Sequence, residues 1–178
     1  WRTGRNVTVT AVDDAIIDGP QSCLVQATAT SNDATYAGRS APAVTATVTD
    51  NDTAGVVFVL DKVTMAEAND SAFLIAKLTS QPFAPVILTL ANNDPTECTL
   101  PSTITLNETN WQSGVGITIL SVDDDLDDEA QLCTIQTTAV SSDNDYHALA
   151  IAETKVTVQD DETAGFAITP TTIAVSEP

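Results

Sequence analysis

Apolar and polar residues alternate along much of this chain, and most of the apolar ones are β-branched. Alternation of Val, Ile and Thr with a period of two is typical of β-strands. In the middle of the chain it predicts seven short strands, at about Val56–Leu60, Ser71–Leu78, Pro85–Leu90, Ser102–Leu106, Gly116–Ser121, Cys133–Val140 and Thr154–Gln159. No segment has a helical period with caps. We therefore expect an all-β fold, an antiparallel sandwich of immunoglobulin-like type.

The sequence repeats itself at an offset of 110 residues. Residues 1–55 align without a gap to residues 111–165, with identities that include Trp1/Trp111, Asp13/Asp123, Cys23/Cys133, Tyr36/Tyr146 and Asp50/Asp160. After each Thr-Ala-Gly ending a similar segment begins, and Glu67 aligns with Glu177. We therefore expect residues 1–55 to be the C-terminal half of a repeat, 56–165 a complete repeat, and 166–178 the first strand of a following repeat.

Two of these three segments are incomplete, and neither can bury its apolar face alone. The simplest interpretation is a window on a longer tandem array. One alternative is an excised fragment. Another is a polymer in which the C-terminal strand of one molecule completes the N-terminal half-repeat of the next, although that would leave the counterpart of residues 69–110 missing.

The three cysteines become interpretable once the repeat is recognised. Cys98 and Cys133 both fall in the complete repeat, whereas Cys23 is the counterpart of Cys133, so its own partner would lie upstream of Trp1. We predict a Cys98–Cys133 disulfide, which places the protein in an oxidising compartment, secreted or at the cell surface. The alternative is three buried free thiols.

Charge and composition exclude several classes of function. Six Lys and Arg stand against 25 Asp and Glu, a net charge of −19, which argues against a nucleic-acid partner. No apolar run reaches the roughly 20 residues of a membrane-spanning helix. One histidine, His147, without a spaced metal or triad companion, and the lack of a Gly-rich phosphate loop predict that the chain is not an enzyme.

Carboxylates crowd at the predicted strand ends. Six lie within residues 123–129 and three more within residues 160–162. Like charges packed together cost stability, and Ca²⁺ removes that cost because it accepts about six to eight oxygen ligands in flexible geometry. The alternative is a solvated acidic turn that keeps a surface protein soluble. That alternative is stronger for residues 13–19, where several carboxylates are missing.

Four motifs follow one another in the complete repeat. They are Val-x-x-Ala-Glu ending at Glu67, Trp-x-x-Gly at 111–114, an Ile-Thr-Ile strand running into Val-Asp-Asp-Asp at 122–125, and Val-Thr-Val-x-Asp-Asp-Glu-Thr-Ala-Gly at 156–165. Together they resemble the Calx-beta repeat, and more closely the tandem Calx-beta-like repeats of very long bacterial surface and secreted proteins. The resemblance covers the whole chain.

The resemblance implies an immunoglobulin-like sandwich that binds Ca²⁺ at one end. Carried over residue by residue, the ligands of the complete repeat are Glu67, Asp94, Asp123, Asp124, Asp128, Asp160 and Asp161. In the first segment the matching residues are Asp13, Asp14, Asp18, Asp50 and Asp52. The sequence departs from the pattern at Gln131 and Gln21, where an acidic ligand is expected. Asp94 is a weaker match, because its loop is short and contains Cys98.

From these features we expect a non-enzymatic, calcium-stabilised structural repeat of a secreted or cell-surface protein, forming an extended rod, stalk, adhesin or filament. Its partners would be neighbouring repeats of the same protein or identical subunits of a filament, with a surface ligand or cell receptor as a further candidate. The alternative is a calcium-sensing regulatory module that changes conformation when Ca²⁺ binds.

Overall fold

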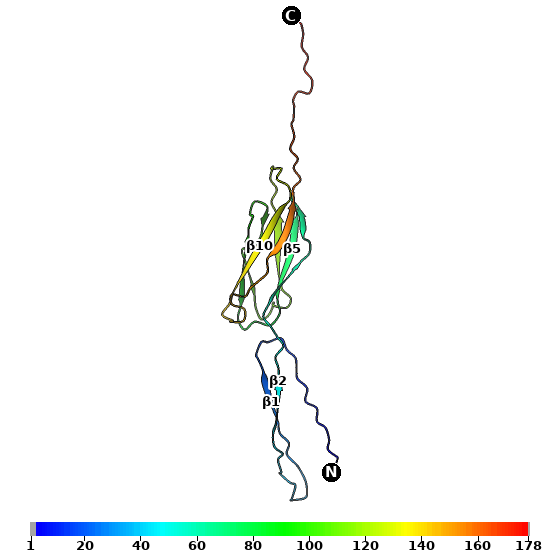
Figure 1. Ribbon diagram of the computed structural model, residues 1–178, viewed down its shortest axis with the longest axis vertical. Helices are drawn as coiled ribbons and strands as arrows, with labels where there is room; N and C mark the ends of the chain where they lie inside the picture. Colours follow the sequence, from blue (N-terminus) through cyan, green and yellow to red (C-terminus); the bar gives the residue numbers. More distant parts are fainter. Residues whose placement is uncertain (1–2, 178) are drawn as a thin grey trace.

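A computed structural model describes residues 3–177, which form a two-sheet sandwich with a separate hairpin at one end (Figure 1). Trp1, Arg2 and Pro178, which belong to the first and last predicted segments, lie outside the described residues. The strands are β1 (Gln21–Val25), β2 (Val44–Val48), β3 (Val56–Leu60), β4 (Thr64–Ala66), β5 (Ser71–Leu78), β6 (Val86–Asn92), β7 (Cys98–Thr99), β8 (Thr103–Leu106), β9 (Val115–Ser121), β10 (Gln131–Val140) and β11 (Thr154–Gln159).

The sandwich contains the strands from β3 to β11. One sheet has the order β4-β11-β10-β6-β8 and the other the order β3-β5-β9-β7. The chain changes sheets between β3, which is antiparallel to β5, and β4, which is parallel to β11. In one sheet β5 pairs with β3 and β9, and in the other β10 lies between β6 and β11. This is the connectivity of an immunoglobulin-like sandwich. The prediction of an all-β sandwich of this type is confirmed.

The strand boundaries follow the alternation of the sequence closely. Val56–Leu60, Ser71–Leu78 and Thr154–Gln159 begin and end where predicted, and the other four predicted strands shift by a residue or two. The burial of β6 alternates residue by residue, as expected when one face of a strand packs on a core. β4 and β7 were not predicted, because strands of three and two residues are too short to show a period.

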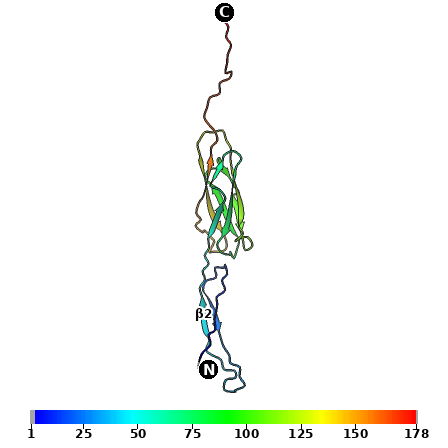
Figure 2. The same cartoon turned by 90° about the vertical axis from the view of Figure 1, so that its right-hand side faces the viewer.

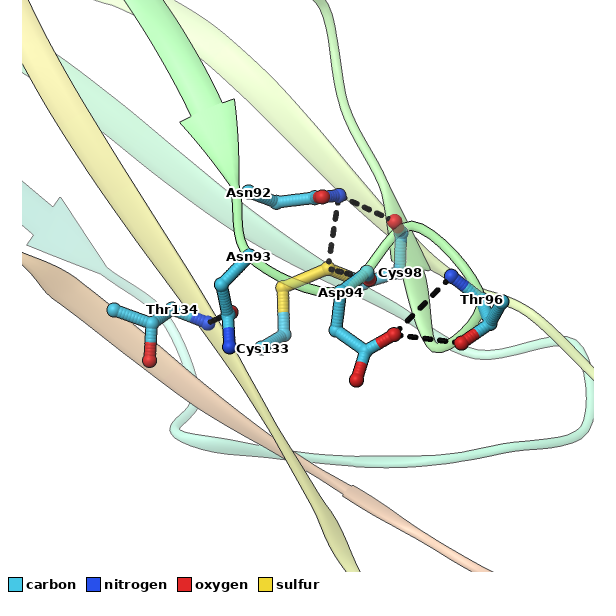
Figure 3. Close-up of a disulfide and its surroundings, with 7 residues drawn as sticks. All are labelled: Asn92, Asn93, Asp94, Thr96, Cys98, Cys133 and Thr134. Atoms are coloured by element: carbon cyan, nitrogen blue, oxygen red, sulfur yellow. Dashed lines mark hydrogen bonds between the residues drawn. A yellow bond between two sulfur atoms is a disulfide. The ribbon is translucent and has the colours of Figure 1, made fainter.

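The core lies between the two sheets and is aliphatic. Its fully buried side chains include Leu74, Leu88, Ile117, Ile119 and Ile135. The Cys98–Cys133 disulfide joins β7 of one sheet to β10 of the other across this core, with the two Cα atoms 6.2 Å apart (Figure 3). Both cysteines are fully buried. The predicted disulfide is therefore present, and it cross-links the two layers.

The β1–β2 hairpin lies beyond one end of the sandwich, and the C-terminal segment extends from the other end (Figures 1 and 2). Within the described part of the chain, residues 160–177 contain no strand. Hydrogen bonds join the first segment to the sandwich at its near end. Gln81 N donates to Ala15 O at 2.7 Å, Thr79 N donates to Gly55 O at 3.1 Å, and Thr79 Oγ1 donates to Thr53 O at 2.5 Å. Residues 3–177 also contain no helix long and apolar enough to cross a membrane.

Candidate metal centre

The carboxylates of Glu67, Asp161 and Glu162 gather at the end of the sandwich from which the C-terminal segment leaves. One oxygen of each lies within 4.8 Å of the others. The parallel pairing of β4 and β11 explains this, because Ala66 is the partner of Gln159 and Glu67 N donates to Gln159 O at 2.9 Å. Parallel neighbours end at the same edge of a sheet, so the acidic residues that follow the two strands must meet there.

Glu67 is the buried member of this group. Its residue is 3% exposed, and one carboxylate oxygen, Oε1, accepts a hydrogen bond from Asp124 N at 3.1 Å. This bond brings the loop between β9 and β10 over the end of β4. Burial raises the pKa of the Glu67 carboxyl above its usual value, and the charges of Asp124, Asp160 and Asp128 raise it further. The site therefore holds a carboxylate whose negative charge is poorly compensated.

The pKa values of Asp160 and Glu162 are shifted in opposite directions. Asp160 Oδ1 accepts from Glu162 N at 3.0 Å and Oδ2 accepts from Glu129 N at 3.1 Å. The hydrogen bond from the Glu162 backbone is the main reason that the pKa of Asp160 is lowered. The pKa of Glu162 is raised to about 7, first by a side-chain hydrogen bond with Asp160, then by burial and by the charges of Asp161 and Glu67. Glu162 Oε2 is buried without a hydrogen-bond partner.

Glu97 is a further acidic residue at this end, and the sequence reasoning missed it. It is 5% exposed, and its pKa is raised by burial and then by the charges of Asp128, Asp94 and Glu67. Its backbone O accepts from Val122 N at 2.9 Å, at the start of the loop between β9 and β10. The sequence held no signal for it, because its burial results from the packing of its loop against the loop between β9 and β10.

Of the other ligands implied for the complete repeat, some lie near this group of carboxylates and others do not. Asp124 and Asp128 are close enough to Glu67 and Glu97 to raise their pKa values. Asp123 is exposed. Asp94 Oδ1 accepts from Thr96 N at 3.3 Å and from Thr96 Oγ1 at 2.6 Å, so this oxygen is engaged in the turn of its own loop (Figure 3).

The first segment has an acidic hollow of its own, of about 250 Å³. Its lining includes the five implied residues Asp13, Asp14, Asp18, Asp50 and Asp52. Asp50 Oδ2 accepts from Gly19 N at 2.8 Å and Oδ1 accepts from Asp52 N at 2.9 Å, which repeats the bonding of Asp160. The pKa of Asp52 is raised by burial and then by the charge of Asp50, whereas the pKa of Asp50 is lowered by the hydrogen bond from the Asp52 backbone.

In the part of the chain that the structure describes, no basic side chain forms an ion pair with the carboxylates of the centre. Among residues 3–177 the ion pairs are Lys62–Asp70 and Lys155–Glu153, and neither includes one of these carboxylates. Oxygen-only groups of this kind suit hard cations, and Ca²⁺ tolerates irregular carboxylate arrangements better than Mg²⁺, which requires near-octahedral geometry and retains water. Histidine and thiolate, which softer metals prefer, are not part of the group.

Comparisons with known proteins place the chain in no family. No family description matches the sequence, and no curated protein matches it. Among solved structures, it is similar to WR4, a C. elegans MSP family member, at 10% identity and a TM-score of 0.36, over 57% of this chain and 95% of that one. It is also similar to the E. coli chaperone DraB at 11% identity and a TM-score of 0.39, over 64% of this chain and 59% of that one.

Proposed function

We propose that this chain is a calcium-stabilised structural repeat of Calx-beta type from a secreted or cell-surface protein. The observation that carries the proposal is the group of Glu67, Asp161 and Glu162, whose oxygens lie within 4.8 Å of one another. A buried carboxylate, Glu67, and an unpaired buried oxygen, Glu162 Oε2, both belong to it. Three acidic groups this close, without a basic side chain, are stabilised by a bound cation or by protons.

Glu67, Asp161 and Glu162 would hold the ion, with Asp124, Asp160 and Glu97 close by. These residues come from the ends of β4, β7 and β11 and from the loop between β9 and β10. A Ca²⁺ ion bound there supplies positive charge to all of these segments. Because the ion would bind the folded arrangement and not the unfolded chain, it stabilises the fold by about 2.7 kcal/mol at a concentration one hundred times its Kd.

The position of the centre supports a structural role. The chain leaves the sandwich through residues 160–165, and Ala164 N donates to Asp127 Oδ2 at 2.7 Å in the same acidic loop. A cation bound to Asp161 and Glu162 would fix the direction in which the following segment leaves. Repetition of this arrangement along a tandem array would stiffen it into an extended rod, stalk or filament, whose partners are neighbouring repeats.

Two features favour this role over calcium sensing. The core of the sandwich is complete without an ion, and the Cys98–Cys133 disulfide joins its two sheets. A sensor needs two conformations that differ by only a few kcal/mol. The disulfide also supports an oxidising, extracellular location. We propose no catalytic activity.

A calcium titration tests the proposal. Calorimetry should detect Ca²⁺ binding, and the melting temperature should rise with millimolar Ca²⁺ and return with a chelator. Glu67→Gln should abolish most of the rise. Glu153→Gln is the matched control, because Glu153 is paired with Lys155 away from the centre, and it should leave the rise intact. Unchanged melting of the parent protein at millimolar Ca²⁺ would refute the metal proposal. A large change in radius of gyration on binding would favour the sensor.

A further inference from the structure

Residues 3–55, which we call the half-sandwich, share the strand pairing and loop hydrogen bonds of residues 113–165, although residues 5–11 do not form a strand as their counterparts Val115–Ser121 do. β1 pairs with β2 in the register Gln21↔Val48, and β10 pairs with β11 in the register Gln131↔Val158, at the same offset of 110 residues as the sequence repeat. The loops agree too. Gly19 N donates to Asp50 Oδ2 at 2.8 Å, and Glu129 N donates to Asp160 Oδ2 at 3.1 Å.

The burial of the two segments differs sharply. Tyr36 is 62% exposed and Val7 is 82% exposed, whereas their counterparts Tyr146 and Ile117 are fully buried. Cys23 is an exposed free thiol, whereas its counterpart Cys133 is buried in a disulfide. The half-sandwich therefore presents to solvent the face that its counterpart packs against a core. Apolar surface left uncovered in this way marks an interaction site.

The sandwich indicates what covers that face. β10 is covered along its edge by β6, from Ile135↔Asn92 to Val140↔Ile87. β11 is paired with β4, and β9 is paired with β5. All three partners belong to residues 56–110. The corresponding stretches of the half-sandwich are residues 25–30, 47–49 and 5–10. Among the described residues, the first two stretches pair only within the β1–β2 hairpin and its Thr28↔Ser40 bridge, so their outer edges are open, and residues 5–10 pair with no strand.

We infer that the half-sandwich is an acceptor for a β3–β8 unit of the same repeat kind, a polypeptide with the strand pattern of residues 56–110, and that Cys23 forms a disulfide with that unit's counterpart of Cys98. In the sandwich this unit supplies β4, β5 and β6 to the three edges and Cys98 to Cys133. The bond forms when two thiols give two electrons and two protons to a small disulfide such as oxidised glutathione, which leaves as two thiols.

The C-terminal segment of a second copy fits the face less well. Its residues Ala174–Ser176 are the counterparts of Thr64–Ala66, the strand β4, so they could pair with residues 47–49. That pairing would leave the edges at residues 5–10 and 25–30 open, and it brings no cysteine. A unit that carries counterparts of β4, β5 and β6 together satisfies every open edge.

The experiment joins a second copy of residues 56–110 directly before Trp1, in the order that the two halves have in the sandwich. Each chain is equilibrated in a glutathione redox buffer, the glutathione is then removed, and the reactive thiols are counted with a chromogenic disulfide. EDTA is present throughout, so that calcium plays no part in the result. The parent chain should show one reactive thiol, Cys23. The extended chain should show none, and peptide mapping should find Cys23 linked to the added cysteine.

Two variants keep the result interpretable. When the added cysteine is changed to Ser, Cys23 should stay free but react at least ten times more slowly than in the parent, because the face is covered. A scrambled extension of the same composition should leave Cys23 fully reactive. Full reactivity in the extended chain would overturn the inference. Protection of Cys23 in the parent chain, in particles larger than a monomer, would overturn it in favour of a second copy as the occupant.

Discussion

The Cys98–Cys133 disulfide allows a stability prediction with a calculable size. The bond closes a loop between residues separated by 35 positions in sequence. In the loop-entropy treatment, a cross-link of this span lowers the entropy of the unfolded chain enough to stabilise the fold by about 4 kcal/mol at 25 °C. The paired change Cys98→Ala/Cys133→Ala should therefore destabilise the sandwich by about that amount. Alanine avoids placing hydroxyl groups at two fully buried positions.

Urea unfolding measures this difference. In a Trp1→Phe background, fluorescence reports on Trp111, which packs against the core of the sandwich. With a slope of about 2 kcal/mol per molar urea, the midpoint should fall by about 2 M. Cys23→Ala should leave the midpoint unchanged, because Cys23 is exposed and unbridged. A loss below about 1 kcal/mol in the paired variant would refute the reasoning, as would a parent protein whose midpoint is unaffected by reductant.

Three further outcomes follow from the site and the core. The pKa of Glu162 is raised to about 7 in the folded chain, so protonated Glu162 stabilises the calcium-free sandwich. This stabilisation is complete below the unfolded pKa of 4.5 and is lost as the pH rises towards 7. The melting temperature in EDTA should therefore fall between about pH 5 and pH 8, and Glu162→Gln should flatten this dependence. Tyr146→Phe should lower the free energy of unfolding in urea by about 1–3 kcal/mol, because the buried Tyr146 hydroxyl accepts from Ser80 N at 3.1 Å and donates to Ser80 O at 2.7 Å. Tyr36→Phe should leave the free energy of unfolding almost unchanged, because Tyr36 is exposed. Gly114→Ala should prevent stable folding at 37 °C, as judged by circular dichroism, because Gly114 has φ +86° and an added Cβ would lie 2.7 Å from Ala76 O.

The sheets were predictable from sequence because each long strand buries one face. β8 and β11 place apolar residues at every second position, Ile104 and Leu106 in one and Val156 and Val158 in the other, and this alternation is visible without knowledge of the partner strands. β4 was not predictable, since its three residues become a strand through parallel pairing with β11, which lies far along the chain. Long-range pairing, rather than local pattern, determines that element, and the position of Glu67 beside Asp161 and Glu162 depends on it.

The candidate centre was predictable in its location but not in its membership. Clusters of acids at the ends of β9 and β11 marked the end of the sandwich at which Glu67, Asp161 and Glu162 lie. Glu97 carried no such mark, because its burial results from the packing of its loop against the start of the loop between β9 and β10. Asp94, chosen by resemblance, has one oxygen occupied by Thr96. Which carboxylate of a loop faces inward depends on the turn that the loop adopts, and a single sequence does not specify it.

The acidic sequences at residues 50–52 and 160–162 occur in two different surroundings, so they separate local from long-range causes of the pKa shifts. Asp50 and Asp160 each accept backbone hydrogen bonds, first from the residue two positions on, and the pKa of each is lowered. Asp52 and Glu162, the residues two positions on, both have raised pKa values, Asp52 mainly through burial and Glu162 mainly through its bond with Asp160. One pair lies in an intact sandwich and the other in the half-sandwich. The opposite pKa shifts of the two acids therefore follow from their spacing and the turn between them. In either setting, deprotonation therefore costs less at the first carboxyl than at the second, and a bound cation would offset the larger cost at the second.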